Sequence, residues 1–152
     1  MKILIVCTGN TCRSPMAEAL LKQIACGDGS TQVISGGLFA AEGERASENA
    51  LRAMQDIGLD ISAHTAKNVN AAVVRDADLI LTMTQAHRDL LLELFGTQAE
   101  SKTYALMDYI GAAGDVADPY GQDLAHYKSC AKMLEDALQK AYEKMRGEQG
   151  GL

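Results

Sequence analysis

Short apolar runs alternate with amphipathic segments along the whole chain. The first run, over residues 2–7, reads Ile-Leu-Ile-Val without a polar interruption and predicts a buried strand. Similar runs predict strands over 31–35, 78–83 and 102–107. Between them, apolar residues recur at helical spacing and predict helices from about 14 to the glycine at 27, over 47–57 and 68–75, from Thr84 as N-cap to Gly96, and over 123–145.

This alternation is typical of a parallel sheet with helices on both faces. We therefore predict a single α/β domain with a four-stranded parallel sheet over 1–146, followed by a frayed C-terminal tail over 147–152. In such sheets ligands bind at the carboxyl ends of the strands, often in the loop after the first strand. The irregular stretch over 108–122 is a second candidate, because long loops in compact domains are often functional.

Charge and composition narrow the possible partners. The chain has 152 residues and a formal net charge of −6 at pH 7, which argues against extended binding to nucleic acid. Its apolar runs are far shorter than the ~20 residues of a membrane-spanning helix, and the apolar start is too short for a secretory signal. We expect a cytoplasmic monomer. Residues 1–17 contain two basic residues and no acid, so positive charge is local to the first loop.

The first loop has the features of a phosphate-binding loop. Cys7 ends the first predicted strand, and Arg13 follows six positions later with a planar fork for two phosphate oxygens. Gly9 and Asn10 can adopt the positive φ that turns backbone N–H groups inward. Pro15 suits the first turn of a helix whose positive end faces the loop. The residues predicted to bind the anion are Thr8, Gly9, Asn10, Thr11, Cys12 and Ser14.

Cys7 is the predicted nucleophile. Its position beside a helix N-terminus and a guanidinium favours the thiolate form, and Ser14 is expected to donate a hydrogen bond to the sulfur. A thiolate next to a bound phosphoryl group predicts attack at phosphorus and a phosphocysteine intermediate, in two displacements. Asp118, in the late loop, is the predicted acid for the leaving group and the predicted base for water.

The stretch from Cys7 to Glu18 resembles the low-molecular-weight protein tyrosine phosphatase family. Residues 118–120, 60–62 with His64, and 77–80 match the family as well, so the resemblance covers essentially the whole chain. It implies a Rossmann/flavodoxin-like fold and phosphorylated protein substrates. It also implies a cysteine mechanism that needs neither metal nor organic cofactor, with Cys7, Arg13 and Asp118 as catalytic residues.

Within this family, Thr11 is the informative position. The resemblance implies that Asn10, Ser14 and Ser35 form a hydrogen-bond network that shapes the loop, and Tyr120 is expected to form one wall of the cleft. Tyrosine-directed members carry isoleucine or leucine at the position of Thr11, whereas the bacterial protein-arginine-phosphatase subgroup carries threonine. A small hydroxylated side chain suits a thin, polar guanidinium. The predicted activity is therefore phosphoarginine hydrolysis, with phosphotyrosine hydrolysis as the alternative.

Two other activities share features of this loop. A thiol-coupled arsenate reductase uses the same fold but needs further cysteines near the third strand, and residues 77–100 contain none. A flavin-binding electron carrier has a similar phosphate loop, but the chain lacks tryptophan and has only 5% aromatic residues with which to enclose a flavin. We therefore rank both below phosphatase activity.

Cysteines and histidines outside the catalytic assignment leave further alternatives. Cys12 either forms a disulfide with Cys7, which would protect the nucleophile from irreversible oxidation, or serves only as a packing thiol in the loop. His64, His87 and His126 are too scattered for a metal site and are expected at the surface or at helix ends.

Overall fold

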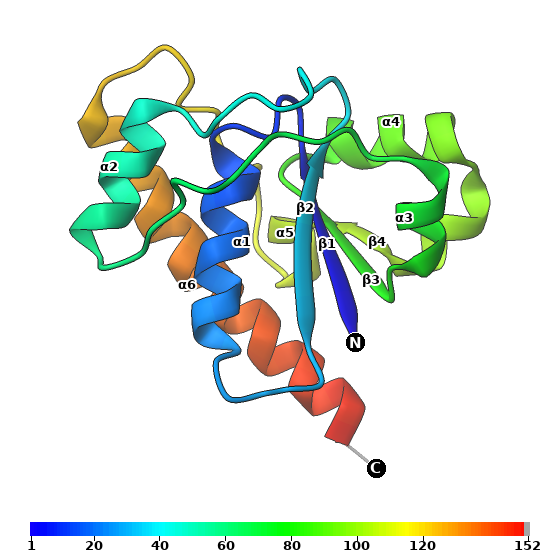
Figure 1. The fold of residues 1–152 in the computed structure, drawn as a ribbon. Helices are drawn as coiled ribbons and strands as arrows, with labels where there is room; N and C mark the ends of the chain where they lie inside the picture. Colours follow the sequence, from blue (N-terminus) through cyan, green and yellow to red (C-terminus); the bar gives the residue numbers. More distant parts are fainter. Residues whose placement is uncertain (151–152) are drawn as a thin grey trace.

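Four parallel strands form the central sheet of the protein (Figure 1). The computed structural model describes residues 1–150, with side chains up to Glu148. The strands are β1 (Lys2–Cys7), β2 (Gln32–Gly37), β3 (Leu79–Thr82) and β4 (Thr103–Ala105). Their order is β2-β1-β3-β4, and all neighbouring pairs are parallel, which confirms the predicted sheet. Since β2 and β3 lie on opposite sides of β1, the strand order reverses at β1. The loop that follows β1 therefore lies at the point where ligands bind in sheets of this kind.

Helices cover both faces of this sheet, as the alternating pattern predicts. They are α1 (Arg13–Ile24), α2 (Glu48–Asp56), α3 (Ala71–Asp76), α4 (Gln85–Phe95), α5 (Leu106–Tyr109) and α6 (Leu124–Gly150), with a 3₁₀ helix, η1 (Thr97–Lys102). Successive side chains of a strand point to opposite faces. Ile3 and Ile5 therefore join a larger core with α1 and α6, whereas Leu4 and Val6 join a smaller core with α3 and α4. Figure 1 shows α1 and α6 on one side of the sheet and α3 and α4 on the other.

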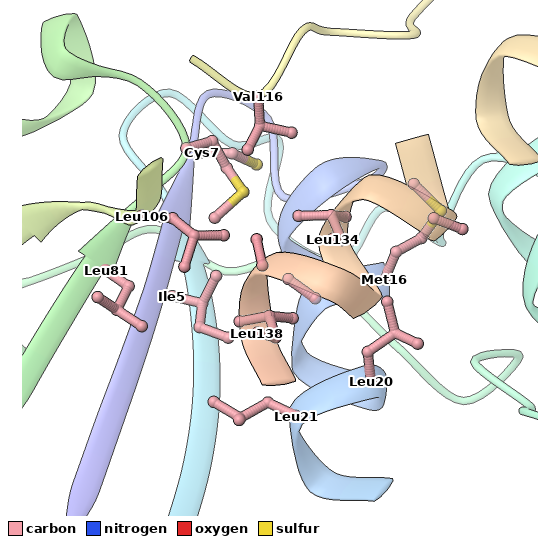
Figure 2. Packing of buried hydrophobic residues seen from close by; sticks show 14 of the residues in the cluster. Ile5, Cys7, Met16, Leu20, Leu21, Leu81, Leu106, Val116, Leu134 and Leu138 are labelled. Carbon is pink, nitrogen blue, oxygen red and sulfur yellow. The ribbon is translucent and has the colours of Figure 1, made fainter. Parts of the chain in front are cut away.

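The larger core lies beneath the carboxyl end of β1 (Figure 2). Ile5 and Leu81 from the sheet face Leu138 of α6. The side chain of Cys7 lies at the upper end of the same cluster, near Val116 of the late loop. Each fully buried aliphatic side chain of this kind contributes about 1.5–3 kcal/mol relative to an exposed one. The packing therefore holds the end of β1, and with it Cys7, in a rigid setting.

The fourth strand is shorter than predicted. The apolar run predicts a strand over 102–107, but β4 ends at Ala105 and Leu106 begins α5. Leu106 is fully buried in the larger core, and the helical turn brings the ring of Tyr109 to 5.2 Å from that of Tyr104, measured between centroids. A continuous apolar run does not reveal this turn, because the same side chains are buried in either conformation.

The third helix begins later than predicted. Residues 68–70 are extended rather than helical, and Asn68 forms an isolated β-bridge with Gly37. Asn70 then caps α3, because its side-chain oxygen accepts a hydrogen bond of 2.9 Å from the backbone N–H of Val73.

The second strand ends later than predicted. Gly36 and Gly37 both belong to β2, which runs two residues past its predicted end at Ser35.

The last helix extends beyond its predicted end. The apolar spacing predicts that α6 ends at Met145 and that residues 147–152 fray, but the helix continues to Gly150. Its last turns are tied to α5: Lys144 donates to the carbonyl of Tyr109 at 2.8 Å, and the hydroxyl of Tyr109 donates to Glu148 at 3.2 Å. Residues 151–152 of the predicted tail lie outside the described residues. Over residues 1–150, no helix is both long and apolar enough to cross a membrane.

Candidate active site

The loop after β1 turns sharply at Asn10. Asn10 has a φ of 57°, in the left-handed region, whereas Gly9 does not have a positive φ, so the turn uses only one of the two predicted residues. Asparagine tolerates this conformation better than most residues. Its buried side chain is also fully bonded, since Nδ2 donates to Ser14 Oγ at 2.8 Å and to Ser35 Oγ at 3.0 Å, and Oδ1 accepts from the N–H of Lys67 at 3.0 Å. These bonds hold the turn in place.

Ser35 connects the loop to α1. Its hydroxyl donates to Glu18 Oε1 at 2.6 Å, and Lys22 pairs with the other carboxylate oxygen of Glu18, also at 2.6 Å. The structure thus joins Asn10, Ser14 and Ser35 into one hydrogen-bonded group and adds Glu18, which sequence reasoning missed.

Two donors surround the sulfur of Cys7, which is only 3% exposed. The backbone N–H of Asn10 lies 3.3 Å from Sγ, and the hydroxyl oxygen of Ser14 lies 2.8 Å from it. Because Ser14 Oγ accepts from the amide of Asn10, its own proton is free to be donated to the sulfur. Donors of this kind stabilise a thiolate.

Arg13 and Asp118 bring the first and the late loop together. Arg13 is buried, and its Nη1 donates to the carbonyl of Val116 at 2.9 Å. Its Nη2 lies 3.4 Å from Oδ2 of Asp118, whose side chain is 49% exposed. The backbone N–H of Tyr120 donates to the other carboxylate oxygen at 3.0 Å. The guanidinium is thus held at the edge of the loop, with one side paired to a solvent-accessible carboxylate.

A cavity of about 260 Å³ opens above Cys7. Tyr120 stands at its rim with an exposed side chain, whereas Ser14 and Ser35 lie behind the loop and are buried. Glu44 also lines the cavity and was not predicted. The lining comprises Cys7, Thr8, Gly9, Asn10, Thr11, Cys12, Arg13, Glu44, Asp118 and Tyr120.

Cys12 lines the same cavity as Cys7, and its thiol contacts side chains of the helical layer. Its thiol donates to Ser47 Oγ at 3.4 Å and lies 3.4 Å from the hydroxyl of Tyr127. Burial, followed by the hydrogen bond to Cys12, raises the pKa of Tyr127 to about 12. Cys7 and Cys12 are both free thiols. The disulfide between them stays a prediction, and the contacts of Cys12 are those of a packing thiol.

Two histidines contact the loop: His87 lies at the start of α4, as expected, but is buried there, and His64 is half-buried. His87 is 9% exposed and its Nε2 lies 2.8 Å from Thr8 Oγ1, while Nε2 of His64 lies 2.7 Å from the carbonyl of Asn10. His126 is exposed at the start of α6, as expected, and bonds to Asp123. The strand order could have indicated His87, because α4 follows β3, the neighbour of β1.

Burial and then the positive charge of Arg13 lower the pKa of His87 to about 4. The unfolded chain binds a proton at His87 below about pH 6.5, but the folded protein does so only near pH 4. Stability should therefore fall as the pH decreases between these values. Between pH 7 and pH 5, we expect the free energy of unfolding to fall by about 1 kcal/mol less in His87→Gln than in the wild type, as measured by urea unfolding. A difference in unfolding free energy between the two proteins that is the same at both pH values would contradict this.

A metal site is not evident in the part of the chain that the structure describes. No three histidine, cysteine, aspartate or glutamate side chains within it come together in a way that could hold a metal ion.

Comparisons with known proteins extend over the whole chain. A family model described as low molecular weight phosphotyrosine protein phosphatase matches residues 2–150. A protein-arginine-phosphatase of Geobacillus stearothermophilus is 39% identical, over 97% of this chain and 98% of that protein. The low molecular weight protein-tyrosine-phosphatase PtpB of Staphylococcus epidermidis is 38% identical, over 92% and 96%.

Solved structures give the same picture. The YwlE arginine phosphatase, in a variant with a phosphorylated active-site serine in place of cysteine, superposes with a TM-score of 0.91. It is 35% identical in sequence, and the match covers 96% of both chains.

Proposed function

Because the chain belongs to the low molecular weight phosphotyrosine protein phosphatase family, we propose that it removes phosphoryl groups from arginine side chains of proteins. It is a cysteine-based, metal-independent protein phosphatase. The observation that carries the arginine assignment is Thr11, a small polar residue that lines the cavity beside Cys7. A neighbouring hydroxyl suits a guanidinium better than an aromatic ring. The relatives named above are all phosphatases, so arsenate reduction and flavin binding gain no support.

In the first step, the substrate's phosphoryl group lies in the loop against the guanidinium of Arg13. The Cys7 thiolate attacks phosphorus, so that an S–P bond forms as the P–N bond breaks. The electron pair of the P–N bond goes to the nitrogen, which takes a proton from the Asp118 carboxyl. The products are phosphocysteine and an arginine guanidinium.

In the second step, water attacks the phosphorus of the intermediate. Asp118, now a carboxylate, accepts a proton from the water, and the S–P electron pair returns to the sulfur. The donors from Ser14 and Asn10, at 2.8 and 3.3 Å, support the returning thiolate, and inorganic phosphate leaves. A phosphorylated residue at the nucleophile position of the YwlE arginine phosphatase supports this route.

The ion pair between Arg13 and Asp118 fits this order of events. At 3.4 Å it is long, and its carboxylate is half exposed, so the pair is weak. A bound phosphoryl dianion offers Arg13 two oxygens at once and replaces the carboxylate. Asp118 is then free to approach the leaving nitrogen.

The experiment that tests the proposal compares phosphoarginine and phosphotyrosine peptides of matched sequence. We expect the wild-type protein to prefer phosphoarginine. In Thr11→Ile, kcat/KM for phosphoarginine should fall about tenfold and that for phosphotyrosine should rise, because the larger side chain covers an aromatic ring but buries guanidinium N–H groups without partners. A clear preference of the wild type for phosphotyrosine would refute the arginine assignment and leave the alternative activity.

We further propose phosphorylated proteins as partners, a cytoplasmic location and a monomeric state. The net charge of −6 and the small size of the cavity support binding of a single phosphorylated side chain rather than of a nucleic acid. Sedimentation at several protein concentrations tests the monomeric state.

A further inference from the structure

Glu44 lies on the loop between β2 and α2 and faces the same cavity as Cys7. Its backbone is fixed on both sides: its N–H donates to the carbonyl of Ala41 at 3.1 Å, and its carbonyl accepts from Ala66 at 2.7 Å. A few residues later, the N–H of Ser47 donates to the carbonyl of Thr11 at 2.9 Å and ties this loop to the phosphate loop. The position of Glu44 at the cavity is thus built into the backbone.

The carboxylate of Glu44 is not used by the fold. Among the described side chains, which end at Glu148, it forms no hydrogen bond or ion pair, and the residue is exposed. The two other acids nearby differ in this respect: Glu42 accepts a hydrogen bond from the N–H of Asn68 at 2.7 Å, and Glu48 pairs with Arg52 at 2.9 Å. Glu44 therefore has its full hydrogen-bonding capacity available for a ligand in the cavity.

A carboxylate at this place has opposite effects on different substrates. The cavity already contains Asp118, and the proposed function places a phosphoryl dianion beside Arg13. For a phosphoryl group on an aromatic ring, a second carboxylate near the dianion is only repulsive. For phosphoarginine, a cationic guanidinium lies between the dianion and the carboxylates, and its N–H groups need acceptors.

We propose that Glu44 is a specificity-determining residue that accepts hydrogen bonds from the guanidinium of the substrate's phosphoarginine. This inference rests on the proposed function. Asp118 protonates the nitrogen bonded to phosphorus, whereas Glu44 accepts hydrogen bonds from the guanidinium nitrogens that take no part in the bond cleavage. Because these nitrogens carry their protons before and during the reaction, Glu44 contributes to substrate binding more than to the chemical step.

The test is Glu44→Gln, assayed on phosphoarginine and phosphotyrosine peptides of matched sequence. We expect KM for phosphoarginine to rise about tenfold with kcat changed less than about twofold, and kcat/KM for phosphotyrosine to stay constant or increase. Glu48→Gln is the matched control, because it removes the same charge four residues away without lining the cavity. This control should leave both substrates unchanged.

Other outcomes separate the inference from the proposed function. If Glu44→Gln loses kcat/KM equally on both substrates, or shows no change on phosphoarginine, the role of Glu44 is overturned. The proposed function still stands in that case, provided that the wild type hydrolyses phosphoarginine. A wild-type protein without activity on phosphoarginine overturns both. Free phosphoarginine serves as a further substrate: an effect of Glu44→Gln limited to peptides with basic neighbouring residues would overturn guanidinium binding in favour of contact with the flanking sequence.

Discussion

Cys7→Ser should lose about four to six orders of magnitude in kcat/KM on a phosphoarginine peptide. A serine hydroxyl at neutral pH is a much weaker nucleophile than a thiolate. The surroundings of Cys7 are suited to a thiolate, because the N–H of Asn10 and the hydroxyl of Ser14 both lie within hydrogen-bonding distance of the sulfur. These donors cannot give serine the missing reactivity.

The serine variant should also trap the intermediate. Once a phosphoryl group is transferred to the introduced hydroxyl, its release requires an alkoxide to leave instead of a thiolate, which makes the second step very slow. Intact-mass measurement after incubation with substrate should show a protein that carries one phosphoryl group, as the serine variant of YwlE does. Since the substitution removes little volume, the midpoint temperature of thermal unfolding should be close to that of the wild type.

Cys26→Ser is the matched control for this experiment. Cys26 is an exposed free cysteine just beyond the end of α1 and does not line the cavity. The control should keep wild-type kinetics and remain unphosphorylated. If Cys7→Ser kept substantial turnover, or Cys26→Ser lost it, the proposed nucleophile would be wrong.

Asp118→Asn should lower kcat on phosphoarginine peptides by about two to four orders of magnitude. A guanidine is a strongly basic leaving group and departs slowly from phosphorus without a proton. Asparagine keeps the shape of the side chain and its position beside the N–H of Tyr120, but its amide protons are not acidic enough to be transferred to the leaving group. The lost ion pair with Arg13 contributes under about 1 kcal/mol to stability, because the carboxylate is half exposed.

The leaving group separates acid catalysis from a structural effect. An aryl phosphate with an acidic phenol needs little protonation, so Asp118→Asn should slow its release in the first step far less than it slows phosphoarginine cleavage. Rapid-mixing measurements of the released phenol isolate this step. Asp115→Asn provides the control on the same loop: Asp115 accepts a hydrogen bond from the N–H of Gln85 and does not line the cavity. Equal losses on both substrates would contradict the acid role.

Much of the site lies in one short stretch of sequence, which is why it could be predicted. Cys7, Arg13 and the residues between them are placed by a strand end, a turn and a helix start, all of which depend on neighbouring residues. Caps such as Thr84, whose hydroxyl accepts from the N–H of His87 at 3.0 Å, are equally local. Element boundaries were less predictable where burial was continuous, as at the end of β4, because burial alone does not distinguish a strand from a helical turn.

The sequence by itself determined the alternation of strands and helices, the parallel sheet and the local structure of the loop from Cys7 to Arg13, because each depends on periodicity or on residues close in the chain. Only the tertiary structure decided which distant residues meet that loop. The strand order β2-β1-β3-β4 brings the start of α4, and with it His87, against Thr8. Backbone hydrogen bonds between loops bring Glu44 to the cavity. Such contacts arise from packing between separate elements, and no local pattern around His87 or Glu44 records which element each will face.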